Sequence, residues 1–394
     1  MKLIVIALNG CPIASLGPYG NEWIATPNLD RLAAEGVVFD HHISDCPDSR
    51  AARRVWRTGR NFDLLSAVTS RGIRTILVDH TRPANALPPE FLAGWSEVVL
   101  ARPQSPDHSP SDELLRVLPT VFDRLTDASD WLLWIECDRL LPPWHVPQDV
   151  FEVYVEDLVE EVEPTEYIEQ ILPWTDPQTG WFDQDDFASW ELLHRSIATA
   201  ITVFDADLGR LFDLFRERGL DHSATWLFTA DRGFPLGEHG QLGPHRPWLH
   251  AELVHLPLIV RFPNASQAGR HVTALTQSPD LLPTLATWFG IAVEPVAFDG
   301  FDLGPLLAGT VESVREFAVT QYMTADAEEW AIHTPEWSLL LPIRQPEDDD
   351  PRSPLLFEKP ADYWEVNDQR SRHLETAEEL EAKLRTAIPS GSNK

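Results

Sequence analysis

One short basic stretch carries the residue types best suited to binding an anion. Ser49 is followed by five arginines within residues 49–60. If the stretch is helical, Arg53, Arg57 and Arg60 share one face, because they recur at i, i+4 and i+7. The first N–H groups of a helix lack partners within it and attract anions. The stretch therefore predicts a site for a tetrahedral oxyanion or, at even odds, a solvated basic face on a surface helix capped by Ser49.

The stretch also resembles a known signature. Sulfatases of the alkaline phosphatase superfamily carry C/S-x-P/A-x-R, followed after four residues by T-G-R, and the segment from Ser49 to Arg60 fits this spacing without a gap. The family's nucleophile is a formylglycine made from the Cys or Ser, so the resemblance implies that Ser49 is the nucleophile and a candidate for this modification. Cys46 offers a second register, but that register needs three extra residues before Thr58.

The resemblance continues on both sides of this helix. Residues 26–36 (T-P-N-L-D-R-L-A-A-E-G) match the family's opening, and residues 256–263 (L-P-L-I-V-R-F-P) match a later block almost letter for letter. The two aspartates that ligate calcium in the family fall on Asn9 and Gly10. Asn can offer one carbonyl oxygen to a hard cation, whereas Gly offers no side chain.

Near the later block, the family reads S-D-H/N-G and then G-E-H-G. Asp231 and His239 are retained here, but Arg232 replaces the metal-binding His or Asn. The resemblance therefore implies a degenerate metal site formed by Asn9 and Asp231. It also implies the catalytic set Ser49, Arg53, Arg60 and His239.

Three further positions are expected to contact the substrate together with Arg232. His80 stands after the strand 72–78, where the family tends to place a lysine, although capping or surface roles are commoner for such a histidine. Trp144 and His145 stand where the family shows D-P-H-x-P. Between Leu3 and Glu358 the chain has no lysine at all, so any mechanism that needs an active-site lysine in that span is excluded.

A cation beside Asp231 would face the fixed charge of Arg232. Two like charges about 4 Å apart repel by roughly 4 kcal/mol at an effective dielectric near 20. We therefore expect Arg232 to take the place of the cation and to pair with Asp231. No cofactor is expected unless the degenerate site still binds calcium or another divalent cation.

Two functional hypotheses follow from these residues. The first is a sulfuric ester hydrolase that acts through Ser49 or its formylglycine. The second is a metal-free pseudo-sulfatase that binds an anion or a partner protein without turnover. A small, sulfate ester-like anion is the expected ligand in the first case, and the sequence does not decide between the two.

The order of strands and helices predicts an α/β fold. Near-continuous apolar runs at 2–8, 131–135 and 225–229 are typical of buried parallel strands, and 192–218 predicts a long amphipathic helix. The family resemblance implies a large, mostly parallel sheet flanked by helices, as in alkaline phosphatase. We expect this domain to span 1–310 and a smaller α+β subdomain to span 311–394.

Composition restricts the partners. The formal net charge of −31 argues against nucleic acid as a partner, because nucleic-acid-binding proteins show a basic footprint. No run of about eighteen apolar residues is present, so no membrane span is expected. The apolar run at 2–8 is short for a signal peptide, and three scattered cysteines do not suggest a disulfide framework, so a cytoplasmic location is expected. The oligomeric state is left open.

Overall fold

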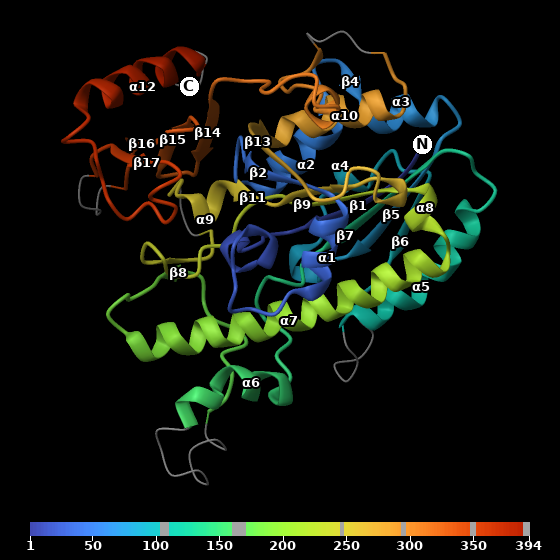
Figure 1. Cartoon of the computed structure of the whole chain (residues 1–394), viewed down its shortest axis with the longest axis horizontal. Helices are drawn as coiled ribbons and strands as arrows, with labels where there is room; N and C mark the ends of the chain where they lie inside the picture. The colour runs from blue at the N-terminus through green and yellow to red at the C-terminus, as the bar shows by residue number, and fades with distance from the viewer. Residues whose placement is uncertain (103–109, 160–170, 245–247, 293–296, 347–351, 389–394) are drawn as a thin grey trace.

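A nine-stranded mixed sheet forms the centre of the protein in the computed structural model, which describes residues 1–102, 110–159, 171–244, 248–292, 297–346 and 352–388 (Figure 1). The strand order is β11-β2-β12-β9-β1-β7-β5-β6, and β13 also pairs with β2. The strands are β1 (Lys2–Leu8), β2 (Val37–Ile43), β5 (Arg74–His80), β6 (Glu97–Leu100), β7 (Trp131–Cys137), β9 (Thr225–Ala230), β11 (His255–Leu256), β12 (Leu258–Arg261) and β13 (Arg270–Gln277).

The central strands run parallel and end together. In the register, Leu8 at the end of β1 lies opposite both Cys137 of β7 and Ala230 of β9. β5 continues the parallel arrangement beside β7, whereas β12 returns antiparallel between β9 and β2. Because parallel strands bring their carboxyl ends to one edge, the residues that follow β1 and β9 meet the last residues of β7.

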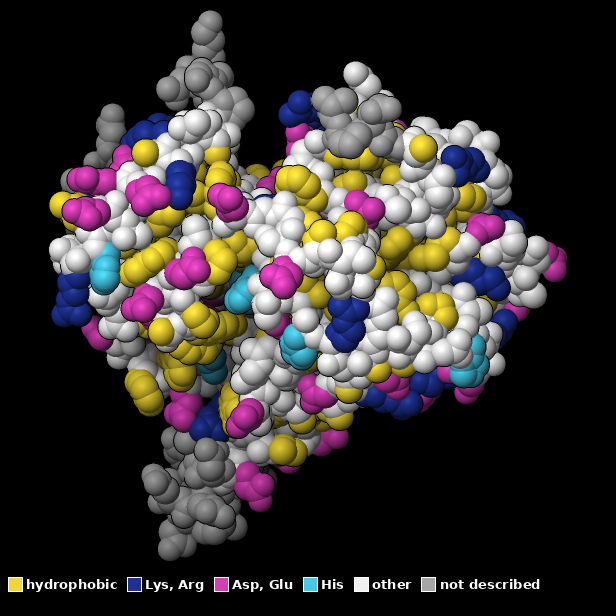
Figure 2. All heavy atoms as spheres, turned by 45° about the horizontal axis from the view of Figure 1, so that its top comes forward, with side chains coloured by type: hydrophobic (Ala, Val, Ile, Leu, Met, Phe, Trp, Pro, Cys, Tyr) yellow, Lys and Arg dark blue, Asp and Glu magenta, His cyan; other side chains and the backbone are white. Residues whose placement is uncertain are grey.

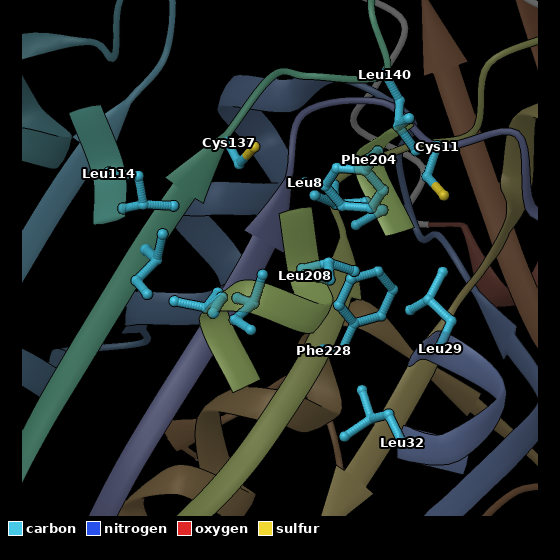
Figure 3. Close-up of a cluster of buried hydrophobic side chains, with 14 of the residues drawn as sticks. Leu8, Cys11, Leu29, Leu32, Leu114, Cys137, Leu140, Phe204, Leu208 and Phe228 are labelled. Atoms are coloured by element: carbon cyan, nitrogen blue, oxygen red, sulfur yellow. The ribbon is translucent and has the colours of Figure 1, made fainter. Parts of the chain in front are cut away.

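Alternate residues of β1 serve two separate hydrophobic cores, as the period of a strand requires. Ile4, Ile6 and Leu8 belong to the core beneath α1 (Pro27–Glu35), α5 (Pro110–Leu125) and α7 (Phe187–Glu217). Figure 3 shows part of this core, where Leu8 lies near Phe204. The opposite face carries Leu3, Val5 and Ala7, which share a core with residues of α2 (Ser49–Arg57), α3 (Leu64–Thr69) and α10 (Leu281–Trp288).

A second, antiparallel sheet forms the C-terminal part. Its order is β14-β15-β16-β17, and α12 (Leu374–Ala387) packs against β15 and β16. The four strands are β14 (Ala318–Met323), β15 (Glu328–His333), β16 (Trp337–Arg344) and β17 (Leu355–Glu358). β14 is joined to the main domain by hydrogen bonds from Gln321 N to Asp45 O and from Thr320 Oγ1 to Ser44 O, of 2.9 and 2.6 Å. The α/β prediction is confirmed, whereas the division at residue 310 stays a prediction.

Between β5 and residue 102 the chain forms a 3-10 helix (Pro83–Asn85), a short α-helix and a strand. A short helix, α4 (Pro89–Leu92), precedes β6, which forms the edge of the main sheet. Residues of β6 are alternately exposed and half-buried, although the last three of its four residues are apolar. The expected acidic excursion at 151–190 contains most of α6 (Gln148–Val159), while residues 160–170 lie outside the described part.

Acidic side chains are spread over the molecular surface and mingle with basic ones on the face shown in Figure 2. On that face the acidic side chains are not gathered in one patch. Among the described helices, none combines the length and apolar character needed to cross a bilayer.

Candidate functional site

Three polar side chains meet at the carboxyl edge of the main sheet. Asn9 follows β1, Asp231 follows β9, and Glu136 is the next-to-last residue of β7. The parallel register places Ala7 opposite Glu136, so these side chains come to one edge although they are far apart in the sequence. All three are buried: Asn9 is 5% exposed, and Glu136 and Asp231 are fully buried.

Helix α2 begins directly above this edge. Its N-cap is Asp48, whose Oδ1 accepts hydrogen bonds from Arg50 N and Ala51 N at 3.0 and 2.8 Å. Ser49 Oγ donates instead to Asn9 Oδ1 at 3.0 Å. The prediction of Ser49 as the cap is therefore wrong, because the Asp48 carboxylate already accepts from two of the N–H groups expected to attract an anion.

Arg53 lies one turn further along α2 and is held between two carboxylates. Its Nη2 and Nε donate to Glu136 Oε2 at 2.9 and 3.2 Å, and its Nη1 lies 3.0 Å from Asp231 Oδ2. Neither carboxylate depends on Arg53 alone. Trp134 Nε1 donates to the other oxygen of Glu136, and Gly10 N donates to the other oxygen of Asp231, both at 2.9 Å.

The pKa values of Arg53 and Glu136 are both shifted from their ordinary values. Burial alone would lower the pKa of Arg53, but the charges of Glu136 and Asp231 outweigh burial and raise it. Burial raises the pKa of Glu136, and Arg53 opposes that effect. The guanidinium therefore remains charged, and it neutralises one of the two carboxylates that flank it.

Arg232 does not form the expected ion pair with Asp231, because Arg53 forms it. The backbone of Arg232 accepts a hydrogen bond from Cys11 N at 3.0 Å. Its side chain is half-buried, and in the described part of the chain its Nε has no hydrogen-bond partner.

The surroundings of Arg232 include a residue from the C-terminal sheet. Burial raises the pKa of Tyr322, the charge of Asp48 acts in the same direction, and the charge of Arg232 opposes both. Cys46 also acts on this phenol. Tyr322 of β14 therefore lies in the same neighbourhood as Arg232 and the start of α2.

The basic face expected from Arg53, Arg57 and Arg60 does not form one anion site. Arg57 is buried, and its guanidinium donates to the carbonyl oxygens of Phe91 and Ala93. Arg60 lies beyond the end of α2, is exposed, and pairs with Asp299 at 2.7 Å. The helical spacing failed because α2 ends at Arg57 and the next residues form the short strand β3 (Thr58–Gly59).

His239 belongs to a different cluster. Its Nδ1 lies 2.6 Å from Glu252 Oε1, its Nε2 lies 3.2 Å from Glu365 O, and its ring stacks on His250 at 3.7 Å. Burial would lower the pKa of His239, but the hydrogen bond and charge of Glu252 raise it to about 9. None of the interactions found for His239 in the described part of the chain involves Ser49 or Arg53.

The remaining candidates lie in the protein interior. His80 ends β5, is 2% exposed, and its Nδ1 lies 2.6 Å from Ala101 O, while burial lowers its pKa. Trp144 is part of the hydrophobic core, and its indole N–H donates to Leu140 O at 3.0 Å. Burial also lowers the pKa of His145, which is half-buried. The substrate roles of these residues stay predictions.

Sequence reasoning missed Glu136 and Tyr322. Glu136 is an acidic residue at the end of an apolar strand, where ligands gather in α/β sheets, so it could have been found. Tyr322 carries no such signal, because its place near Arg232 depends on how β14 docks onto the segment Ser44–Asp45.

The oxygen donors at this edge do not fit a hard cation. Asp231 is committed to Arg53, Asn9 Oδ1 accepts from Ser49, and Gly10 has no side chain. Calcium usually takes six to eight oxygen ligands. Over the described residues, no group of three or more His, Cys, Asp or Glu is arranged to hold a metal ion.

Comparison with known proteins places the chain. The family profile described as Sulfatase matches residues 145–291. The steryl-sulfatase of Mus musculus is 35% identical over 441 aligned positions, which cover 85% of this chain and 70% of that protein. The chain belongs to the sulfatase family.

Other sulfatases match at lower identity. Human arylsulfatase A is 26% identical over 366 positions, covering 80% of this chain and 69% of that protein. An N-acetylglucosamine-6-O-sulfatase of Bacteroides thetaiotaomicron is 28% identical over 194 positions, which span 46% of this chain and only 31% of the relative. By family, the chain is related to sulfuric ester hydrolases.

Solved structures share the fold over nearly the full length. The phosphonate monoester hydrolase of Agrobacterium radiobacter superposes with a TM-score of 0.72 at 18% identity, covering 98% of this chain and 95% of that one. A protein solved with its substrate D-glucosamine-2-N,6-O-disulfate gives a TM-score of 0.69 at 17% identity, covering 98% and 97%. At this identity the likeness concerns the fold alone.

Proposed function

We propose that this sulfatase-family protein recognises a sulfate ester-like anion without a divalent cation and without hydrolysing it. The observation that carries the proposal is the position of Arg53 between Asp231 and Glu136. Because Arg53 pairs with Asp231, that carboxylate is not free to ligate a cation at this edge of the sheet.

A guanidinium cannot replace the chemistry of a metal. It has no open coordination position and cannot lower the pKa of a bound hydroxyl by direct ligation. The Ser49 hydroxyl donates to Asn9 Oδ1, and a neutral amide oxygen does not accept the proton as a base. Without a base or a metal, a serine hydroxyl is a weak nucleophile.

Arg232 is the group best placed to contact the anion. Arg53 is already paired with two carboxylates, and Asp48 occupies the first N–H groups of α2, so neither offers free donors. Arg232 keeps an Nε with no partner in the described part of the chain, and it lies near Tyr322 and the start of α2. A small sulfate ester could therefore be held by Arg232 at this end of the sheet.

The test combines metal content, turnover and binding on the full chain. We expect less than stoichiometric metal by elemental analysis after purification without chelator, and no turnover of 4-nitrophenyl sulfate with or without calcium. Calorimetry should show saturable binding of 4-nitrophenyl sulfate, weakened about tenfold or more by Arg232→Gln, since a charged hydrogen bond contributes roughly 1.5–3 kcal/mol. Arg60→Gln is the matched control and should leave binding unchanged. Absence of binding by the wild-type protein would overturn the proposal.

Hydrolysis is the second candidate, and the contact between Ser49 and Asn9 favours it. The contact places the expected nucleophile at the edge of the sheet where the resemblance implies the metal. Stoichiometric metal, together with calcium-dependent turnover that Ser49→Ala abolishes, would establish this candidate and refute the first. Mass spectrometry of the proteolytic peptide that contains Ser49 would show whether formylglycine is present. The cytoplasmic location stays a prediction.

A further inference from the structure

A cavity separates the edge of the main sheet from the C-terminal part of the chain. Its volume is about 280 Å³, near the lower end of ligand pockets, which run from roughly 300 to 1,000 Å³. One wall comes from β2 and α9 (Ala251–Val254), and the other from the segments that follow β15 and β17. Figure 1 shows α9 between the two sheets. None of the anion-site residues discussed above lines this cavity.

Apolar and aromatic side chains make up much of the lining. The main domain contributes Tyr19, Ile43 and Leu275, and the C-terminal part contributes Pro335 and Tyr363. The Tyr19 hydroxyl is already engaged, since it accepts from Leu258 N at 2.8 Å and lies 3.3 Å from Leu258 O. The walls therefore present mainly aromatic rings and aliphatic carbon atoms to a bound molecule.

The charged groups of the lining are paired with protein groups. Lys359 Nζ forms an ion pair with Glu365 Oε1 at 2.9 Å and donates to the carbonyl oxygens of Asp362 and Tyr363 at 3.1 Å. Asp40 Oδ1 lies 2.7 Å from His271 Nδ1. An ion entering the cavity would therefore lose its hydration without finding a free counter-charge, so the site suits an uncharged molecule.

Two imidazoles among the lining residues keep hydrogen-bonding capacity. His333 is 6% exposed; its Nδ1 lies 3.1 Å from Ser338 Oγ, and its Nε2 is buried with no partner in the described part of the chain. Burial lowers the pKa of His333 to about 4, so the ring is neutral at pH 7. His41, which lies beside the ring of His255, also makes no side-chain hydrogen bond among the described residues.

Water alone is a poor occupant of this space. A buried polar atom without a partner costs roughly 1–3 kcal/mol, so His333 Nε2 calls for a partner. One water fills only about 30 Å³, and each further water needs two to four polar partners that the apolar walls do not offer. An organic molecule fills the space and satisfies the imidazole at the same time.

We propose that the cavity binds an uncharged, ring-bearing small molecule whose hydroxyl or carbonyl group contacts His333 Nε2. Its ring lies against Tyr19 and Tyr363, and so it touches both parts of the chain. A molecule that binds only the folded state and spans both walls also raises the melting temperature. This site is separate from the anion site, so either proposal can fail without the other.

The probe is 2-naphthol, added to the full chain and followed by calorimetry and by nitrogen-detected NMR of the histidine rings. We expect saturable binding at one site, a rise in melting temperature, and a shift of the His333 ring signals in the wild-type protein. Ala251→Phe places a ring in the cavity and should abolish binding. His333→Phe keeps the size of the ring and should weaken binding about tenfold, as the loss of one hydrogen bond implies.

Two controls locate the effect. Ala325→Phe makes the same change at an exposed turn and should leave 2-naphthol binding unchanged. Arg232→Gln, which is designed to disable the anion site, should do likewise. Absence of saturable binding by the wild-type chain, or binding that survives Ala251→Phe, would overturn the proposal. If the Ala251 variant does not fold, wild-type His333 signals that do not move at saturating 2-naphthol would overturn it equally.

Discussion

Arg53 and Glu365 are both buried charges that hold opposite charges around them, yet they stand in different surroundings. Arg53 is a cation between two carboxylates of the main sheet, one on β7 and one after β9, on either side of β1. Glu365 is an anion between Lys359 and His250, and it joins the segment after β17 to the start of α9. The first cluster lies within one domain, whereas the second lies between two parts of the chain and borders the 280 Å³ cavity.

The comparison of the two clusters shows that a match to the family's sequence motifs does not by itself mean that the family's chemistry is retained. The Arg53 cluster stands where the sulfatase resemblance implies a metal and a nucleophile, but its groups are committed to one another. The Glu365 cluster was not expected from any motif, and it borders the smaller of two cavities: Arg53 lines one of about 600 Å³, whereas Glu365 lines the one of about 280 Å³.

The largest effect is expected from Arg53→Met. Without the guanidinium, Glu136 and Asp231 remain buried with no counter-charge, and breaking a buried pair in this way costs about 3–5 kcal/mol. Urea unfolding at pH 7 would measure the loss. The double variant Arg53→Met/Glu136→Gln should recover part of it, because one of the stranded charges is removed. A loss below about 1 kcal/mol would show that Arg53 does not bind both carboxylates.

The matching test of the second cluster is Glu365→Gln, with an expected loss of about 2–4 kcal/mol at pH 7. Burial would raise the pKa of Glu365, but the bonds and charges of His250 and Lys359 hold it well below its usual range. Its contribution is therefore present above about pH 4.5 and declines as the pH falls below that value. Wild type and variant should converge in acid, and a constant difference down to pH 2 would contradict the ion pairing.

His239 provides a test in the opposite pH direction. Its pKa is raised to about 9 from an ordinary value of 6.5, so its contribution is complete below pH 6.5 and is lost as the pH rises through 9. Over that window, wild type should lose roughly 2–3 kcal/mol relative to His239→Gln. Burial and the charge of Glu252 raise the pKa of neighbouring Glu238 to about 7, so only the difference between the two unfolding curves isolates His239.

A smaller difference in stability is expected between variants of Asp48, the N-cap of α2, and of Ser49, the expected nucleophile. Asp48→Ala removes the acceptor for two backbone N–H groups and should cost about 1 kcal/mol, whereas Ser49→Ala removes one side-chain contact and should cost about half as much. Thermal unfolding of both variants measures the ranking. A larger loss of stability for Ser49→Ala than for Asp48→Ala would show that Ser49 caps the helix.

The smallest effect is expected at Arg60. Its ion pair with Asp299 is exposed on both sides, so Arg60→Gln should change stability by no more than about 0.5 kcal/mol and should be insensitive to the state of either buried cluster. A larger loss, measured by urea unfolding at low and high salt, would show that this arginine belongs to a wider charge network.

Much of the fold was predictable from local patterns. The apolar run 2–8 coincides with β1, the run 225–229 lies within β9, and the helix expected at 192–218 overlaps α7. These elements were predictable because burial on both faces of a parallel strand leaves a continuous apolar run. β6 was missed because it is only four residues long, and its three consecutive apolar residues are too short a run to mark a strand.

The sequence by itself determined which charged groups stand at the ends of which strands, because strand ends and helix starts are local properties. Only the tertiary structure decided the partners. Asp231 was expected to pair with Arg232, but it pairs with Arg53. Arg53 also donates a hydrogen bond to Glu136, 83 residues away in the sequence. Pairing depends on the direction of a side chain and on distances of about 3 Å, and residue spacing along the chain fixes neither. The cavity beside His333 was likewise invisible in the sequence, because its two walls come from opposite ends of the chain.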